Sequence, residues 1–263
     1  MSLGFGGEVT EFYHRFRRGY PPAVFGILTE VFGLSAADVV LDLGCGTGQL
    51  ARPIAAGVRA VLGMDPEPDM LVRARRAALD ENIRNVTWLL GGDTDVPALG
   101  TLLGDDRLGV TTIGQALHWM EPAPLFRALR SLSRPGGGVA VVTNGEPLWL
   151  QDSPWSRALR EVLESWLGRR LTRTCGTDEA SHARYRAELV KAGYRVDVRT
   201  VEYTGHLDVD DVVGGVFSAM SVDRLPAPEL RAEFADRVRE ALTPHAPFVE
   251  SVRVRLLTGR VPR

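Results

Sequence analysis

A short apolar segment that runs into a glycine-rich turn is the feature that most constrains the fold of this chain. Residues 39–43 have the sequence VVLDL, which is typical of a buried parallel strand. Gly44, Gly46 and Gly48 follow directly. Glycine adopts positive φ at low cost and lets a ligand approach the backbone closely, and the start of a helix offers unpaired N–H groups. We therefore expect a strand, a ligand-binding turn and a helix over residues 48–56.

Strands and helices then alternate along the first 144 residues. Apolar runs predict further strands at 60–64, 86–90, 108–115 and 138–143, and helical spacing predicts helices at 67–78 and 125–132. Such alternation favours a doubly wound parallel sheet. Residues 194–207 and 248–257 alternate like two more strands. We therefore expect an α/β fold whose sheet is completed late in the chain.

Amphipathic segments outside this core predict helices that cover the sheet or form a cap. Residues 9–32 have helical spacing that Pro21 and Pro22 interrupt, which predicts two helices. Further helices are expected at 155–167, 179–192, 208–221 and 227–242. We expect a single domain over residues 1–263, with a cofactor-binding core at 35–144 and lid or substrate-cap segments at 1–32, 145–176 and 208–245.

The composition argues against several other classes of protein. The formal net charge of -2 lacks the basic excess of most nucleic-acid-binding proteins. No apolar run approaches the roughly 18 residues of a membrane helix, and the first residues do not resemble a secretory signal. Cys45 and Cys175 show neither disulfide nor metal-ligand spacing. We therefore expect a cytoplasmic protein that binds no metal, no nucleic acid and no membrane. The chain has a single lysine, Lys191, among its basic residues, which suggests a GC-rich bacterial genome.

The glycine turn alone leaves two classes of ligand open. Dinucleotide-binding enzymes use G-x-G-x-x-G, which places a pyrophosphate at the helix N-terminus, but this chain has Gln49 where the third glycine is required. Asp65 follows the second expected strand, about 20 residues beyond the turn. A carboxylate there accepts hydrogen bonds from ribose hydroxyls. Nicotinamide-dependent oxidoreductases share this feature, so Asp65 alone does not choose between cofactors.

Three motifs in order resemble the class I methyltransferases that depend on S-adenosylmethionine (SAM). Asp42 with the G-x-G-x-G turn resembles their motif I, the sequence DPEPDML from Asp65 resembles their D-x-S-x-x-M-L pattern, and GGDTDVP from Gly91 resembles their G-D-A-x-x-L-P segment. The resemblance implies SAM as cofactor, S-adenosylhomocysteine as product, and a seven-stranded Rossmann-like sheet whose last strand is antiparallel. The cofactor-binding residues that it implies are Asp42, Gly44, Cys45, Gly46, Thr47, Gly48, Asp65, Pro66, Met70, Gly92, Asp93, Thr94 and Gln115.

Other segments resemble one branch of this family, which includes enzymes of ubiquinone and menaquinone biosynthesis and trans-aconitate methyltransferase-like enzymes. The sequence ALHW at 116–119 resembles an A-x-H-W segment, and LSRPGGG at 132–138 resembles the turn before the fifth strand. The sequence YHRFRRGYP is similar to an amino-terminal segment of the branch, which implies that Tyr13 and Tyr20 cover the cofactor. The resemblance implies a small-molecule metabolite as substrate.

The chemistry of methyl transfer leaves three possible roles for His118. The reaction is a one-step displacement in which the acceptor must lie in line with the methyl group, and a base is needed only if the acceptor carries its proton at neutral pH. His118 could act as that base, contact the substrate together with Trp119, or simply pack beside Trp119. The cluster of Arg169, Arg170 and Arg173 fits either an anion-binding site or a solvated face.

Several alternatives stay open at this point. An RNA or protein methyltransferase would keep the cofactor site and change the substrate, although the chain lacks the N/D-P-P-Y/F string of many enzymes that methylate amino groups of nucleic acids. A protein that binds SAM without transferring its methyl group would share the same motifs. The sequence does not choose between a monomer and a homodimer.

Overall fold

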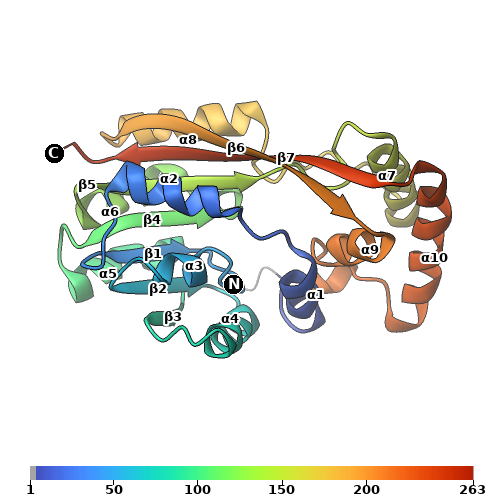
Figure 1. The fold of residues 1–263 in the computed structure, drawn as a ribbon, viewed down its shortest axis with the longest axis horizontal. Helices are drawn as coiled ribbons and strands as arrows, with labels where there is room; N and C mark the ends of the chain where they lie inside the picture. Colours follow the sequence, from blue (N-terminus) through green and yellow to red (C-terminus); the bar gives the residue numbers. More distant parts are fainter. Residues whose placement is uncertain (1–3, 263) are drawn as a thin grey trace.

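The computed structural model describes residues 4–262 and shows a seven-stranded sheet covered by helices (Figure 1). The strands are β1 (Val39–Leu43), β2 (Ala60–Asp65), β3 (Val86–Leu90), β4 (Leu108–Gly114), β5 (Ser133–Asn144), β6 (Arg195–Leu207) and β7 (Phe248–Arg260). Their order in the sheet is β3-β2-β1-β4-β5-β7-β6. Strand β7 is antiparallel to β5 and β6, and the other neighbours are parallel. The predicted Rossmann-like fold, with its last strand antiparallel, is confirmed.

Helices cover both faces of the sheet because apolar stripes recur at helical spacing. The helices are α1 (Glu8–Phe16), α2 (Pro22–Phe32), α3 (Ala51–Ala55), α4 (Pro68–Asp80), α5 (Val96–Leu103), α6 (Pro122–Leu132), α7 (Pro154–Leu167), α8 (Glu179–Lys191), α9 (Val209–Phe217) and α10 (Arg231–Leu242). Helices α2 and α3 contribute to the core on one face, and α5, α6 and α8 contribute to the core on the other. Pro22 occupies the first turn of α2, and Gly33 ends this helix with a φ of 59°.

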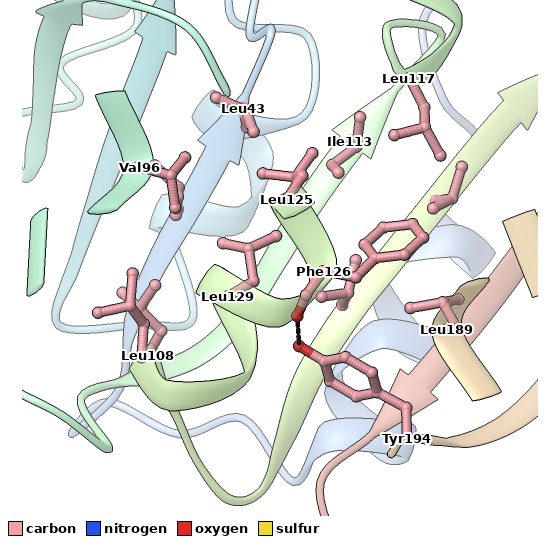
Figure 2. Close-up of a cluster of buried hydrophobic side chains, with 14 of the residues drawn as sticks. Leu43, Val96, Leu108, Ile113, Leu117, Leu125, Phe126, Leu129, Leu189 and Tyr194 are labelled. Atoms are coloured by element: carbon pink, nitrogen blue, oxygen red, sulfur yellow. Dashed lines mark hydrogen bonds between the residues drawn. The ribbon is translucent and has the colours of Figure 1, made fainter. Parts of the chain in front are cut away.

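Helix α6 shows how such a stripe becomes core (Figure 2). Leu125, Phe126 and Leu129 are buried against the sheet because positions three and four apart lie on the same face of a helix. The Tyr194 hydroxyl donates a hydrogen bond of 3.2 Å to the Phe126 carbonyl, so this buried tyrosine satisfies its polar end.

A cap extends from one end of the sheet. Strand β5 pairs with β7 only as far as Asn144 and Val254, whereas β6 follows β7 to the pair of Leu207 and Phe248. This long two-stranded extension leads to α7, α9 and α10, which lie together beyond the sheet in Figure 1 and share a separate apolar core. Helix α1 joins them, because the Phe12 ring lies 5.1 Å from the Phe217 ring, centre to centre.

Several elements differ from the sequence prediction. Helix α5 was not predicted at all. Helix α3 covers only Ala51–Ala55, because the glycine turn continues to residue 50. Strand β5 begins at Ser133, so the glycines expected as a turn form an irregular stretch paired with β4. In the cap, α9 ends at Phe217 and α10 begins at Arg231, both inside the predicted ranges.

Candidate active site

A large cavity lies between the carboxyl ends of the central strands and the cap. Its volume is about 1290 Å³, and Gly44, Asp65 and Gly114 line it from the ends of β1, β2 and β4, while Leu163 and Leu207 line it from the cap. The order of the strands reverses between β1 and β4. In open α/β sheets, ligands bind at this switch point, outside the carboxyl ends of the strands. The cavity is therefore the candidate active site.

Most of the residues predicted for the site line this cavity. They are Tyr13, Tyr20, Gly44, Gly46, Asp65, Pro66, Met70, Gly92, Asp93, Thr94, Gln115, His118 and Trp119. Asp42, near the end of β1, and Cys45, Thr47 and Gly48, in the glycine turn, are not part of the cavity wall that residues 4–262 form. Direct contact of these four residues with a cofactor stays a prediction.

Asp42 has a structural role that the sequence did not reveal. Its Oδ1 accepts a hydrogen bond of 2.7 Å from the Thr112 hydroxyl on β4, and its Oδ2 accepts one of 3.0 Å from the Ala51 N–H at the start of α3. The side chain is buried, and burial raises the pKa of this carboxyl to about 7. Asp42 thus joins β1, β4 and α3 beneath the glycine turn.

The glycine turn folds back over the end of β2. The N–H groups of Gly44 and Cys45 donate to the Met64 carbonyl at 2.8 and 3.0 Å. Gly44 has a φ of 69°, and a Cβ at this position would lie 2.5 Å from the Cβ of Ala116 in the turn after β4. Only glycine fits this close approach of the two turns.

Asp65 anchors the turn and faces the cavity. Its Oδ2 accepts a hydrogen bond of 2.8 Å from the Gly46 N–H, and its Oδ1 accepts one of 2.9 Å from the Glu67 N–H. The residue is only 7% exposed, and burial raises the pKa of its carboxyl to about 6. Asp65 is therefore ionised at pH 7.5, and each oxygen keeps a lone pair for a further donor.

Gln115 stands at the end of β4 in a conformation that non-glycine residues rarely adopt. Its φ is 53°, and its N–H donates a hydrogen bond of 2.9 Å to the Val142 carbonyl of β5. Its side-chain oxygen is buried and has no hydrogen-bond partner within residues 4–262. Such backbone strain is maintained only where the surrounding structure requires it, and a buried acceptor without a partner is costly. Both features indicate a ligand-binding position.

The segment between α1 and α2 crosses the same strand ends. A Cβ at Gly46 would lie 3.5 Å from the Tyr13 ring, and the Gln49 side chain donates to the Arg17 carbonyl at 3.0 Å. Burial raises the pKa of the Tyr13 and Tyr20 phenols, so both stay protonated at neutral pH. Tyr13 lies against the glycine turn, and the Tyr20 hydroxyl would lie 2.7 Å from a Cβ at Gly114, at the end of β4. That the two rings cover a cofactor stays a prediction.

The sequence did not identify the residue that holds this segment in place. Arg18 forms an ion pair of 3.0 Å with Glu250, which is 2% exposed, and donates a hydrogen bond of 2.9 Å to the Asn144 carbonyl. The Asn144 amide in turn donates to the Gly19 carbonyl at 3.0 Å. No local pattern points to a pair formed between the two ends of the chain.

His118 and Trp119 form the wall beside the cap. Their rings lie 5.1 Å apart, centre to centre, and the Arg173 guanidinium lies 4.1 Å from the centre of the Trp119 ring. Burial, together with the charges of Arg173 and Arg17, lowers the pKa of His118 to about 4. His118 is therefore neutral at physiological pH, and a pKa this low makes it a weak base, which favours a hydrogen-bonding role over proton abstraction. Within residues 4–262, no group of three or more His, Cys, Asp or Glu could hold a metal ion, and no helix is long and apolar enough to span a membrane.

Comparison with known proteins agrees with this site. The family model described as "Methyltransferase domain" matches residues 40–137. An uncharacterized methyltransferase of Mycobacterium tuberculosis is 32% identical over 251 residues, which are 95% of this chain and 90% of the relative. The trans-aconitate 2-methyltransferase of Methylobacterium nodulans is 31% identical over 234 residues, which are 85% of this chain and 84% of that enzyme.

A similar fold occurs in a solved structure from Anaeromyxobacter dehalogenans, provisionally described as a type II methyltransferase. The TM-score is 0.64 at 24% identity, and the match covers 94% of this chain and 100% of the other. This likeness concerns the fold alone, whereas the full-length relatives establish the family. The resemblance inferred from the motifs is confirmed: the chain belongs to the methyltransferase family and has its class I, Rossmann-like fold.

Proposed function

We propose that this protein transfers a methyl group from SAM to a small-molecule acceptor held beneath the cap. The observation that carries this proposal is the single cavity that the glycine turn and Asp65 share with the cap residues. Sites for one drug-sized ligand have volumes of roughly 300–1,000 Å³, and this cavity measures about 1290 Å³. It has room for the cofactor and a small acceptor together.

The residues on the strand side of the cavity fit SAM. The Asp65 carboxylate offers acceptors to the two ribose hydroxyls, because neither of its hydrogen bonds to the backbone uses all lone pairs of an oxygen. The unpaired Gln115 oxygen offers an acceptor to the ammonium group of the methionine part. Asp93 lines the cavity, and we expect it to accept a hydrogen bond from the adenine amine.

Methyl transfer requires the protein mainly to position the cofactor and the acceptor and to exclude water. When bound, SAM supplies a methyl group on a positively charged sulfur, which is a good leaving group. Tyr13 and Tyr20 cover the strand ends and exclude water from the cofactor side. Trp119 and neutral His118 line the cavity, and we expect them to contact the acceptor. Proximity and orientation of this kind provide a large part of the rate in a one-step displacement.

The test is binding followed by transfer. We expect calorimetry to show micromolar binding of SAM and S-adenosylhomocysteine and no binding of NAD. Labelled methyl groups should then pass from SAM into the small-molecule fraction of a bacterial extract and not into its RNA or protein. Absence of binding by the folded protein would refute the proposal. Label in RNA or protein would establish one of the alternative substrates, and binding without any transfer would indicate a SAM-binding protein.

His118 provides a separate prediction once a substrate is available. His118→Gln should lower kcat/KM by no more than about tenfold, because a single hydrogen bond from a neutral group contributes roughly 0.5–1.5 kcal/mol. The pH–rate profile from pH 6 to 8 should keep its shape, because the pKa of His118 is lowered to about 4 and the ring does not titrate in this range. His245→Gln, on the exposed surface, is the matched control. A loss above 100-fold with an altered profile would show that His118 is a base.

A further inference from the structure

We propose that the acceptor is an acid, and that Arg17 and Arg173 bind its carboxylate or phosphate group on the cap side of the cavity. This inference rests on the proposed function and adds the class of substrate. It depends on three features of the cavity: unpaired positive charge, a buried guanidinium N–H without an acceptor, and an arginine that lies over an aromatic ring.

The positive charge of the cavity is unbalanced on the cap side. Arg17, Arg169, Arg170 and Arg173 line the cavity, and within residues 4–262 none of them has a carboxylate within 4.0 Å. The acidic residues of the strand side are already used by the backbone. The Asp65, Glu67, Asp93 and Asp95 carboxylates accept hydrogen bonds from the N–H groups of Gly46, Gly4, Glu121 and Gly92, respectively.

The acidic residues of the cap do not neutralise these arginines either. Asp211 accepts a hydrogen bond of 3.0 Å from the Asp208 N–H, and Asp223 lies 4.0 Å from Arg224. Glu146 also lines the cavity but forms no ion pair with these arginines within residues 4–262. The cap side therefore presents cationic groups without a carboxylate at ion-pair distance, and an anionic ligand would supply a counter-charge. A cationic acceptor would be repelled by the same groups.

Arg17 has an unsatisfied donor. One of its terminal nitrogens donates to the Ser218 carbonyl at 3.3 Å, and its guanidinium lies 5.2 Å from the centre of the Tyr13 ring. Its Nε is buried and has no hydrogen-bond partner within residues 4–262. A buried donor left unpaired is costly, and a hydrogen bond from a charged donor to an oxyanion is among the strongest in proteins. An oxygen of the ligand would supply the missing hydrogen-bond acceptor for the Nε–H of Arg17.

Arg173 lies over an aromatic ring and also lines the cavity. Its guanidinium lies 4.1 Å from the centre of the Trp119 ring, a cation–π contact that does not neutralise its charge. A guanidinium has five N–H donors, so it can also bind a carboxylate or phosphate. Arg17, Arg173 and His118 all line the cavity. Burial is the main cause of the lowered pKa of His118, and the charges of Arg173 and Arg17 lower it further. Both charges therefore act on His118, and we expect one anionic group beside this residue to interact with both arginines.

The test uses matched probes on the full-length protein. Benzoate, phenyl phosphate and uncharged benzamide would be titrated by calorimetry, with and without saturating S-adenosylhomocysteine. We expect benzoate or phenyl phosphate to bind at least tenfold more tightly than benzamide, and the tighter of the two identifies the anionic group as carboxylate or phosphate. Equal binding of benzamide and both anions would overturn the proposal.

Variants assign the effect to the two arginines. Arg173→Gln and Arg17→Gln should each weaken the binding of the anion by about tenfold, and Arg173→Lys should restore only part of the affinity, because lysine lacks the planar fork. Arg195→Gln, on the exposed edge strand and outside the cavity, is the control. Anion binding that is unchanged in Arg173→Gln would refute this inference, whereas a wild-type protein that fails to bind S-adenosylhomocysteine but binds benzoate would refute the proposed function alone.

Discussion

Replacing Asp65 with asparagine should raise the Kd for S-adenosylhomocysteine by about 100-fold at pH 7.5. The carboxylate lines the cavity and is ionised at this pH, so it offers charged acceptors to the ribose hydroxyls. Asparagine keeps the shape but loses the charge, and one of its two polar atoms donates instead of accepting. Hydrogen bonds to charged groups contribute roughly 1.5–3 kcal/mol each, and a 100-fold change corresponds to about 2.7 kcal/mol. Calorimetry measures the change directly.

The pH dependence of binding gives the same prediction an independent signature. Burial raises the pKa of Asp65 to about 6, so protonation below pH 6 removes the charged acceptor. Wild-type affinity should fall about tenfold between pH 7.5 and pH 5, and the Asp65→Asn variant should show no such fall. Asp80→Asn replaces an exposed carboxylate at the end of α4 and should behave like the wild type.

Stability measurements separate lost binding from unfolding. The pKa of Asp65 is higher in the folded protein than the ordinary value of 3.8. Its contribution to stability is therefore fully present below about pH 3.8 and is lost as the pH rises through about 6. Relative to the wild type, Asp65→Asn should gain free energy of unfolding in urea as the pH rises from 4 to 7. A variant that is folded at pH 7.5 and binds within threefold of the wild type would contradict the role of Asp65.

The sequence was sufficient to predict the sheet and the place of the site. Buried parallel strands are short apolar runs, and here the first three are followed by glycine or aspartate, after Leu43, Met64 and Leu90. Because the carboxyl ends of parallel strands meet at one edge, residues after different strands had to converge there. Asp65, Asp93 and Gln115 do line one cavity. Helix α5 was missed because Pro97 and Gly100 interrupt a sequence whose buried positions, Val96 and Leu99, are few.

The direction of individual side chains could not be predicted in the same way. Asp42 lies in the expected strand, yet its carboxyl is bonded to Thr112 and Ala51 beneath the turn. Only the tertiary arrangement of β1, β4 and α3 brings these three groups together. The ion pair of Arg18 and Glu250 likewise depends on β7 passing the α1–α2 segment. Periodicity and motifs report which face a residue occupies, but they do not report which partner meets it there.

The close approach of the turns after β1 and β4 leads to the second prediction of large effect. Gly44→Ala should lower the free energy of unfolding by about 2–5 kcal/mol. A positive φ costs an L-residue roughly 1–2 kcal/mol, and overpacking costs roughly 1–3 kcal/mol more. Here φ is 69°, and the added Cβ would lie 2.5 Å from the Ala116 Cβ and 3.2 Å from the Met120 methyl group.

A second substitution separates these two costs. Ala116→Gly removes the methyl group that the new Cβ would meet, and alone it should cost only about 0.5–1 kcal/mol, the usual penalty of glycine. In the Gly44→Ala background, the same change should instead stabilise the protein, because it relieves the clash and leaves only the cost of positive φ. Urea unfolding of the four proteins yields the coupling energy, which should be at least about 1 kcal/mol in the direction of rescue. Strictly additive effects would mean that the two turns do not meet as described.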